Sequence, residues 1–184
     1  MIAVRILIVV ALQTVALAYM IYDRQTMLNS SRVVTLKVAP VDPRDIFRGD
    51  YVILNYAISR LELDKLAGDD AFTNGETVFV TLQRQGTDWN AVAIARARPY
   101  LVQGGVPIRG TVDFVEFADK AIPVAVTVSY GIESYFVPEG TGRAIEEERQ
   151  KGDLTADIAI DGQGRAAIKA LRRQGQVFYV EGVF

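Results

Sequence analysis

Residues 154–170 read LTADIAIDGQGRAAIKA, and apolar side chains alternate with other residues on both sides of a glycine-containing turn. A period of two is typical of β-strands that bury one face and expose the other. The turn is Asp161-Gly162-Gln163-Gly164, and the apolar residues on either side of it would share one face of a hairpin. Those residues are Leu154, Ala156, Ile158 and Ile160 before the turn and Ala166, Ile168 and Ala170 after it. The stretch predicts an antiparallel β-hairpin.

The same pattern extends over most of the chain. Further strands are expected at 34–38, 51–58, 78–82, 89–95, 106–117, 123–130 and 176–183. Residues 61–67 and 140–150 have the spacing of short helices. A length of 184 residues suits one domain, and no linker is long enough to separate two. We therefore expect a mainly β fold, an antiparallel β sandwich or barrel-like domain with short helices.

Two segments of the expected sheets resemble each other. Residues 55–59 read NYAIS and residues 129–133 read SYGIE. Each segment is followed by a helical or loop stretch and then by a glycine-turn hairpin, which starts at Thr77 in one case and at Leu154 in the other. The echo predicts two related halves that pack together in one sandwich or barrel.

The N-terminal segment has a different character. Residues 2–22 read IAVRILIVVALQTVALAYMIY, and a helix of this length spans about 30 Å, the thickness of the bilayer hydrocarbon. Its apolar residues surround the helix instead of forming a stripe, which argues against a core helix. We expect residues 1–24 to be a transmembrane anchor that contacts the lipid bilayer through residues 2–22. Residues 25–184 would then form the β-rich domain.

A cleaved secretory signal is the alternative interpretation of this segment. Arg5 could serve as its charged region, and Ala16-Leu17-Ala18 resembles a cleavage site. The apolar run continues to Tyr22, beyond the end of a short signal core, and this favours a retained anchor. Both interpretations carry the rest of the chain across the membrane. We therefore expect a single-pass protein whose domain faces the periplasm or the cell exterior.

Composition removes several classes of function. The chain has no cysteine and no histidine, which excludes thiol nucleophiles, Ser-His-Asp triads, disulfides, and zinc sites built from imidazole or thiolate. A net charge of -2 provides no attraction to nucleic acid. The turn at 161–164 lacks the alternating acids of a calcium loop. We expect no metal, no cofactor and no nucleic-acid partner.

Residues 40–56 read PVDPRDIFRGDYVILNY and are dense in opposite charges around a glycine. An aspartate before a proline favours a turn, and the neighbouring charges can form a network of ion pairs. The preferred interpretation is that these charges brace a loop and set the strand register, with Arg48 or Asp50 partly buried and paired. The other interpretation is a binding surface for a ligand or partner. The candidate residues are Asp42, Pro43, Arg44, Asp45, Arg48, Gly49, Asp50, Tyr51, Leu54 and Tyr56.

The octet from Gly49 to Tyr56 has the pattern GDYXXLXY at every fixed position, so the chain resembles the bacterial GDYXXLXY family. The preceding DPRD-x-FRG stretch and the segment from Tyr130 to Gly140 are similar as well, and the resemblance covers nearly the whole chain. It implies a membrane-anchored protein with no agreed catalytic residues. Members commonly sit beside genes for multi-pass membrane proteins, and this implies such a protein as a partner.

Two functions follow as hypotheses. The first is a non-enzymatic accessory domain that binds or stabilises a membrane protein complex. The second is an anchored envelope hydrolase for peptide or glycan, with a carboxylate pair or a Ser/Lys pair. Its candidate pairs are Ser30 or Ser31 with Lys37, Ser59 with Lys65, Asp69 with Asp70, Asp113 with Glu116, and Glu133 with Glu139. The basic residues Arg165, Lys169, Arg172 and Arg173 are either a solvated face or a contact for anionic lipid headgroups.

Overall fold

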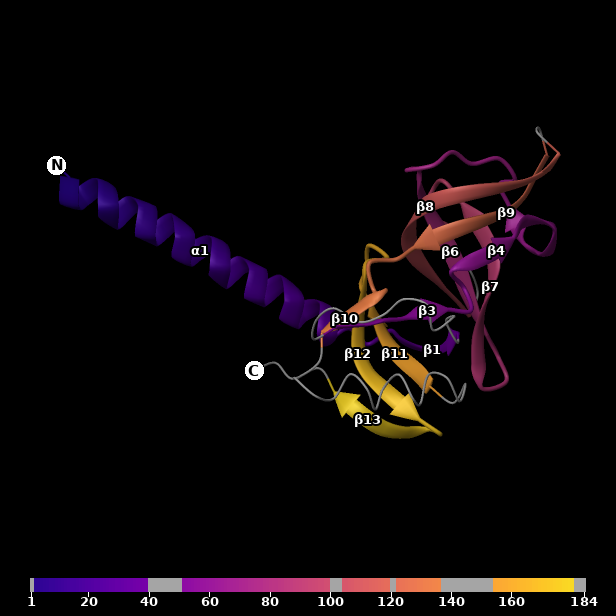
Figure 1. Ribbon diagram of the computed structural model, residues 1–184. Helices are drawn as coiled ribbons and strands as arrows, with labels where there is room; N and C mark the ends of the chain where they lie inside the picture. Colours follow the sequence, from indigo (N-terminus) through magenta and orange to yellow (C-terminus); the bar gives the residue numbers. More distant parts are fainter. Residues whose placement is uncertain (1, 40–50, 100–103, 120–121, 137–153, 181–184) are drawn as a thin grey trace.

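The computed structural model describes residues 2–39, 51–99, 104–119, 122–136 and 154–180. It begins with a helix, α1 (Ile2–Leu28), which projects away from a β-rich body (Figure 1). The side chains of α1 are exposed along its apolar length, and Leu28 at its end is buried. A core helix would be covered by the body, so the expectation that α1 is not one is confirmed. By length and composition, α1 could cross a membrane.

The body is built from strands, and most of the expected ones are present. They are β1 (Val33–Ala39), β2 (Tyr51–Ile53), β3 (Asn55–Tyr56), β4 (Arg60–Glu62), β5 (Ala67–Gly68), β6 (Thr77–Gln85), β7 (Asp88–Ala95), β8 (Gly105–Asp119), β9 (Ile122–Ser129), β10 (Ser134–Phe136), β11 (Leu154–Ile160), β12 (Ala166–Arg173) and β13 (Gln176–Val180). A 3-10 turn, η1 (Leu63–Lys65), stands within the expected helix at 61–67. The expected helix at 140–150 lies outside the described residues.

These strands form two main sheets. One has the order β13-β12-β11-β1-β3, the other has the order β4-β9-β8-β6-β7-β5, and β2 pairs separately with β10. The sheets curl around one continuous apolar cluster that includes Leu36, Leu82 and Ile158 (Figure 1). The prediction of a mainly β, sandwich-like fold is therefore confirmed. One pair departs from the antiparallel expectation, because β5 runs parallel to β7.

The strand expected at 51–58 is divided into two short strands that join different partners. β2 pairs with β10, whereas β3 pairs with β1. Leu54 lies between them, is fully buried, and donates its backbone N–H to the carbonyl of Glu133 at 2.7 Å. The sequence shows an unbroken apolar run here, because the chain stays in the core while it passes from one partner strand to another.

The two related halves are visible in the strand register. β2 pairs with β10 through Ile53 and Ser134, and β4 pairs with β9 through Arg60 and Thr127. Moving 74 positions along the chain takes Ile53 to Thr127 and Arg60 to Ser134. The first pairing is therefore the counterpart of the second. The halves also exchange strands: β1 pairs with β11 of the second half, and β8 pairs with β6 of the first. The two halves are thus intertwined.

Candidate functional site

The two halves are joined where they cross, by a reciprocal pair of tyrosines. The hydroxyl of Tyr56 donates a hydrogen bond to the carbonyl of Ile132 at 2.8 Å. The hydroxyl of Tyr130 donates to the carbonyl of Ile58 at 2.7 Å. Both tyrosines are buried, and the numbers 56 and 130 differ by the same 74 residues as the strand register.

The backbone around the tyrosines repeats the same exchange. Leu54 donates to the carbonyl of Glu133, and Val128 donates to the carbonyl of Ser59 at 2.8 Å. Within each half, a side chain three residues later accepts from the tyrosine N–H: Ser59 Oγ at 3.1 Å for Tyr56, and Glu133 Oε1 at 2.6 Å for Tyr130. Buried polar groups need such partners, since an unpaired one costs about 1–3 kcal/mol. The crossing is therefore a lock between the halves.

The electrostatics of this lock keep both hydroxyls protonated. Burial raises the pKa of Tyr56 and of Tyr130 well above the ordinary value, and the charge of Glu133 raises both further. A neutral hydroxyl donates its hydrogen bond at all physiological pH values. These tyrosines thus serve as permanent donors to carbonyls of the opposite half.

The family comparison bears directly on Tyr56. The family described as GDYXXLXY protein matches residues 13–171. The chain belongs to the GDYXXLXY family. Comparisons with curated proteins and with solved structures each give no match. The last tyrosine of the family octet is Tyr56, and its fixed leucine is Leu54.

The structure describes the second part of the GDYXXLXY octet. Tyr51 begins β2, where its backbone pairs with Phe136, while Leu54 and Tyr56 are core residues at the crossing. Leu54 and Tyr56 each bond to the second half, through the carbonyls of Glu133 and Ile132. The remaining candidates, Asp42, Pro43, Arg44, Asp45, Arg48, Gly49 and Asp50, lie outside the described residues. Their ion-pair network stays a prediction.

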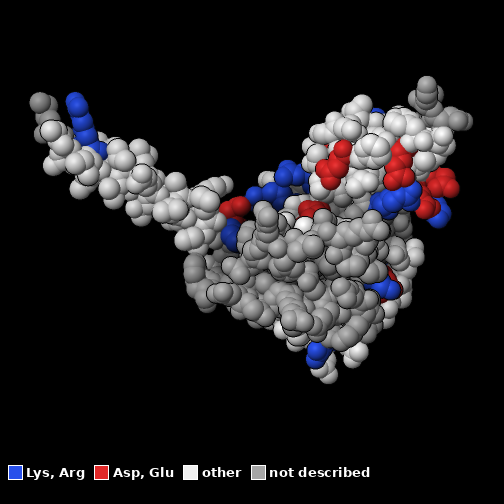
Figure 2. Space-filling view, in the orientation of Figure 1, with Lys and Arg blue, Asp and Glu red and all other residues white. Residues whose placement is uncertain are grey.

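A second polar cluster joins α1 to the β-rich body. Arg165 donates from Nη1 and Nη2 to the two carboxylate oxygens of Asp23, at 3.0 and 2.9 Å. Its Nε donates to Asp161 Oδ2 at 2.6 Å. We call this cluster of Asp23, Asp161 and Arg165 the anchor clamp. Charged side chains gather where α1 meets the body, and most of α1 carries few of them (Figure 2).

The turn between β11 and β12 is shaped to hold the clamp. Asp161 Oδ1 accepts from the backbone N–H groups of Gln163 and Arg165, both at 2.8 Å. Burial on its own would raise the pKa of Asp161, but these bonds and the guanidinium of Arg165 together lower it. The hydrogen bond with Asp23, followed by that with Asp161, raises the pKa of Arg165. All three groups are therefore charged at neutral pH.

Backbone contacts extend the clamp to both sheets. Ser30, just after α1, donates its hydroxyl to the carbonyl of Ile160 at 2.5 Å, and Ile160 donates its N–H to Arg32 at 2.9 Å. On the other side of the turn, Arg109 in β8 donates its N–H to the carbonyl of Gly164 at 2.8 Å. Gly164 has a φ of +83°, and a Cβ there would lie 3.2 Å from Arg109 N. A single turn thus touches the helix and both sheets.

The basic stretch near the C-terminus does not act as one surface. Arg165 belongs to the clamp, and Arg172 donates from Nε to the buried carboxylate of Asp157 at 2.6 Å. Arg173 lies over the ring of Phe178, with 5.3 Å to the centroid. Arg165 and Arg172 are therefore tied to carboxylates within the fold.

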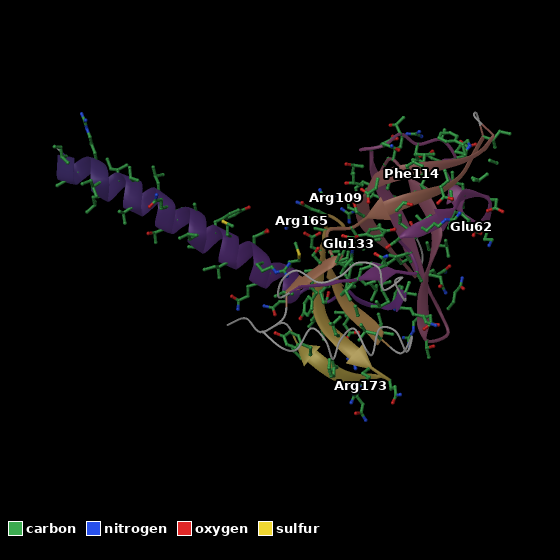
Figure 3. The ribbon with its side chains drawn as sticks, viewed as in Figure 1. Glu62, Arg109, Phe114, Glu133, Arg165 and Arg173 are labelled. Carbon is green, nitrogen blue, oxygen red and sulfur yellow. The ribbon has the colours of Figure 1, made fainter. Side chains whose placement is uncertain are left out.

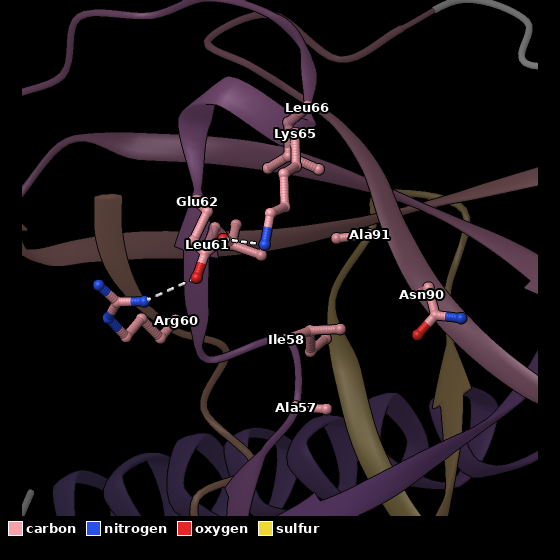
Figure 4. A pocket seen from close by; sticks show the side chains of 9 residues that line it. All are labelled: Ala57, Ile58, Arg60, Leu61, Glu62, Lys65, Leu66, Asn90 and Ala91. Atoms are coloured by element: carbon pink, nitrogen blue, oxygen red, sulfur yellow. Dashed lines mark hydrogen bonds and ion pairs between the residues drawn. The ribbon is translucent and has the colours of Figure 1, made fainter. Parts of the chain in front are cut away.

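A depression beside β4 is a further candidate (Figure 4). It has a volume of about 230 Å³ and is lined by Ala57, Ile58, Arg60, Leu61, Glu62, Lys65, Leu66, Asn90 and Ala91. Glu62 forms ion pairs with Arg60, at 3.3 Å, and with Lys65. The hydrogen bond and charge of Lys65 lower the pKa of Glu62. A carboxylate held ionised in this way is poorly suited to act as a general acid.

Two of the proposed hydrolase pairs, Ser59 with Lys65 and Asp113 with Glu116, are engaged in other bonds. Ser59 Oγ accepts from the N–H of Tyr56, and Lys65 pairs with Glu62 instead. Asp113 accepts from Ser129 Oγ at 2.8 Å, whereas Glu116 pairs with Arg60 at 2.6 Å. The structure gives none of these pairs a mutual hydrogen bond among the described residues.

Proposed function

We propose that this GDYXXLXY protein is a non-enzymatic accessory domain, anchored by α1 in a membrane and facing the extracytoplasmic side, where it binds another membrane protein. The observation that supports this most strongly is the anchor clamp. Asp23 follows the apolar run directly, and its two-point bond to Arg165 fixes the body to the helix. A flexible tether would need no such contact. The domain is therefore held in one orientation next to the bilayer.

The accessory role is also supported by the state of the polar groups. Among the residues of the body that the structure describes, each carboxylate with a resolved pKa shift, namely Glu62, Glu76, Glu116 and Asp161, has a lowered pKa and bonds to Arg or Lys. Active sites typically contain groups whose pKa is shifted toward neutrality. These groups instead stabilise turns and strand pairs.

Topology is tested by fusing alkaline phosphatase or a fluorescent protein after Phe184 of the full chain. The proposal expects phosphatase activity, because that enzyme folds in an oxidising compartment. Cytoplasmic fluorescence without phosphatase activity would overturn the extracytoplasmic orientation.

Partner binding is tested by purifying the full chain in a mild detergent. The proposal expects one membrane protein to co-purify repeatedly with the wild type. Arg165→Gln should reduce its recovery while the chain stays in the membrane fraction, because the body loses its fixed orientation. Arg84→Gln, at the exposed end of β6, is the matched control and should retain the partner. A lone, monodisperse chain with no recurring partner contradicts the proposal.

A further inference from the structure

Two arginines flank the turn that holds the anchor clamp. The backbone carbonyl of Arg32 accepts the N–H of Ile160 just before the turn, and the backbone N–H of Arg109 donates to the carbonyl of Gly164 within it. Both side chains are exposed, and neither guanidinium has an ion pair or hydrogen bond within the part of the chain that the structure describes. Arg109 and Arg165 lie close to the end of α1 (Figure 3).

The clamp places this turn at a defined depth. The bilayer is about 30 Å thick in its hydrocarbon and about 40–45 Å with its headgroups, so each headgroup layer is roughly 5–8 Å thick. Asp23 is the first residue after the apolar run that ends at Tyr22, and Arg165 lies 2.9 Å from it. A turn bonded to that position lies at the level of the headgroups when α1 spans the bilayer.

We propose that Arg32 and Arg109 bind the phosphates of anionic phospholipids in the leaflet at which α1 ends. This inference rests on the proposed function, because it requires α1 to span the membrane. Guanidinium groups suit phosphate, to which they donate two parallel hydrogen bonds. Asp23 and Asp161 both pair with Arg165, so the clamp has a net charge of about −1. Arg32 and Arg109 are two positive charges, so the surface beside α1 is positive as a whole. The surface beside the anchor therefore favours anionic over zwitterionic lipid.

The absence of cysteine makes a direct measurement possible. Gln163→Cys adds a single thiol at an exposed position of the turn, and the bond from its backbone N–H to Asp161 is retained. The full chain carries a fluorescent donor at this thiol and is placed in lipid nanodiscs. The discs contain phosphatidylcholine and phosphatidylglycerol, and a small fraction of either lipid bears an acceptor. The ratio of energy transfer to the two acceptors reports which lipid gathers at the turn.

The expected ratio favours phosphatidylglycerol by roughly fivefold for each arginine at the membrane surface, and it falls as salt is added. Arg32→Gln and Arg109→Gln should each lower the ratio, and the double variant should bring it to one. Arg84→Gln is the matched control and should leave it unchanged. Equal transfer to both lipids in the wild type, or an unchanged ratio in the double variant, overturns the inference.

A second label separates this inference from the proposed function. Thr87→Cys places the donor at the exposed turn between β6 and β7, which lies far from α1 (Figure 1). Transfer to labelled phosphatidylcholine should be higher from Gln163→Cys than from Thr87→Cys. Equal transfer from the two positions means that the body is not held at the membrane by its clamp, so the proposed function fails. Higher transfer from Gln163→Cys without a preference for phosphatidylglycerol refutes the lipid inference alone.

Discussion

Replacing Tyr56 or Tyr130 by phenylalanine removes one hydroxyl from the lock and keeps the ring. The carbonyl of Ile132 or Ile58 then loses a buried donor, which costs about 1–3 kcal/mol of unfolding free energy. For a chain of this size, each kcal/mol lowers the unfolding midpoint by roughly 2–4 °C. Each single variant should therefore melt about 2–12 °C below the wild type. The two losses should be similar, because the two bonds are related by the internal symmetry.

The midpoint is measured by circular dichroism on the full chain in detergent. Tyr179→Phe is the matched control, because that ring also packs against the core, with its centroid 5.5 Å from that of Tyr135, but its hydroxyl has no hydrogen bond within the described residues. It should change stability by less than about 0.5 kcal/mol. If Tyr56→Phe and Tyr130→Phe have the same unfolding midpoint as Tyr179→Phe and the wild type, the hydroxyls do not lock the halves.

The same pair should make the fold sensitive to alkali. Burial raises the pKa of both hydroxyls in the folded state, whereas in the unfolded chain they ionise near pH 10. Their contribution to stability is complete below pH 10 and is lost as the pH rises above it. The difference in unfolding midpoint between the wild type and the double variant Tyr56→Phe/Tyr130→Phe should therefore become smaller above pH 10. A constant gap between pH 8 and 11 would contradict the buried, neutral state of these hydroxyls.

Three further predictions concern the turn and the family motif. Gly164→Ala should lower stability by about 1–2 kcal/mol, because its φ is +83° and Arg109 lies against it, whereas Gly162→Ala, which has open space, should be neutral in the same melting assay. Asp161→Asn should lower the midpoint near pH 7, and the difference from wild type should shrink as the pH falls below about 4, because the folded pKa is lowered. Asp50→Ala should cost about 3–5 kcal/mol if its charge belongs to a buried pair, and an unchanged midpoint would favour a binding surface.

Much of the fold follows from local pattern. The hairpin of β11 and β12 is predicted by alternation around a glycine turn, and α1 is predicted by an apolar run without a stripe. The sequence similarity between residues 55–59 and 129–133 predicts that the domain has two related halves. Their exchange of strands is not predictable in this way, because a period of two identifies a strand and its faces but not its partner. The short strands β4, β5 and β10 were missed, since two or three residues carry no measurable period.

The candidate site was predicted only in part, for a similar reason. The motif identifies Tyr56 and Leu54, but the bond from Tyr56 to Ile132 depends on a segment 76 residues away. The clamp joins Arg165 to a carboxylate 142 residues earlier in the chain. A hint existed in the position of Asp23, directly after the apolar run. A single sequence offers no means of choosing its partner among the many arginines.

The lock and the clamp act on the same body from two sides. The clamp fastens α1 to the turn between β11 and β12, and that turn bonds to β8 through Gly164 and Arg109. β8 pairs with β9, which leads directly to Tyr130 and so to the carbonyl of Ile58 in the other half. Hydrogen bonds between described residues therefore connect α1 to both halves. Because a displacement of the helix end must move the clamp, we expect both sheets to follow the helix as one unit.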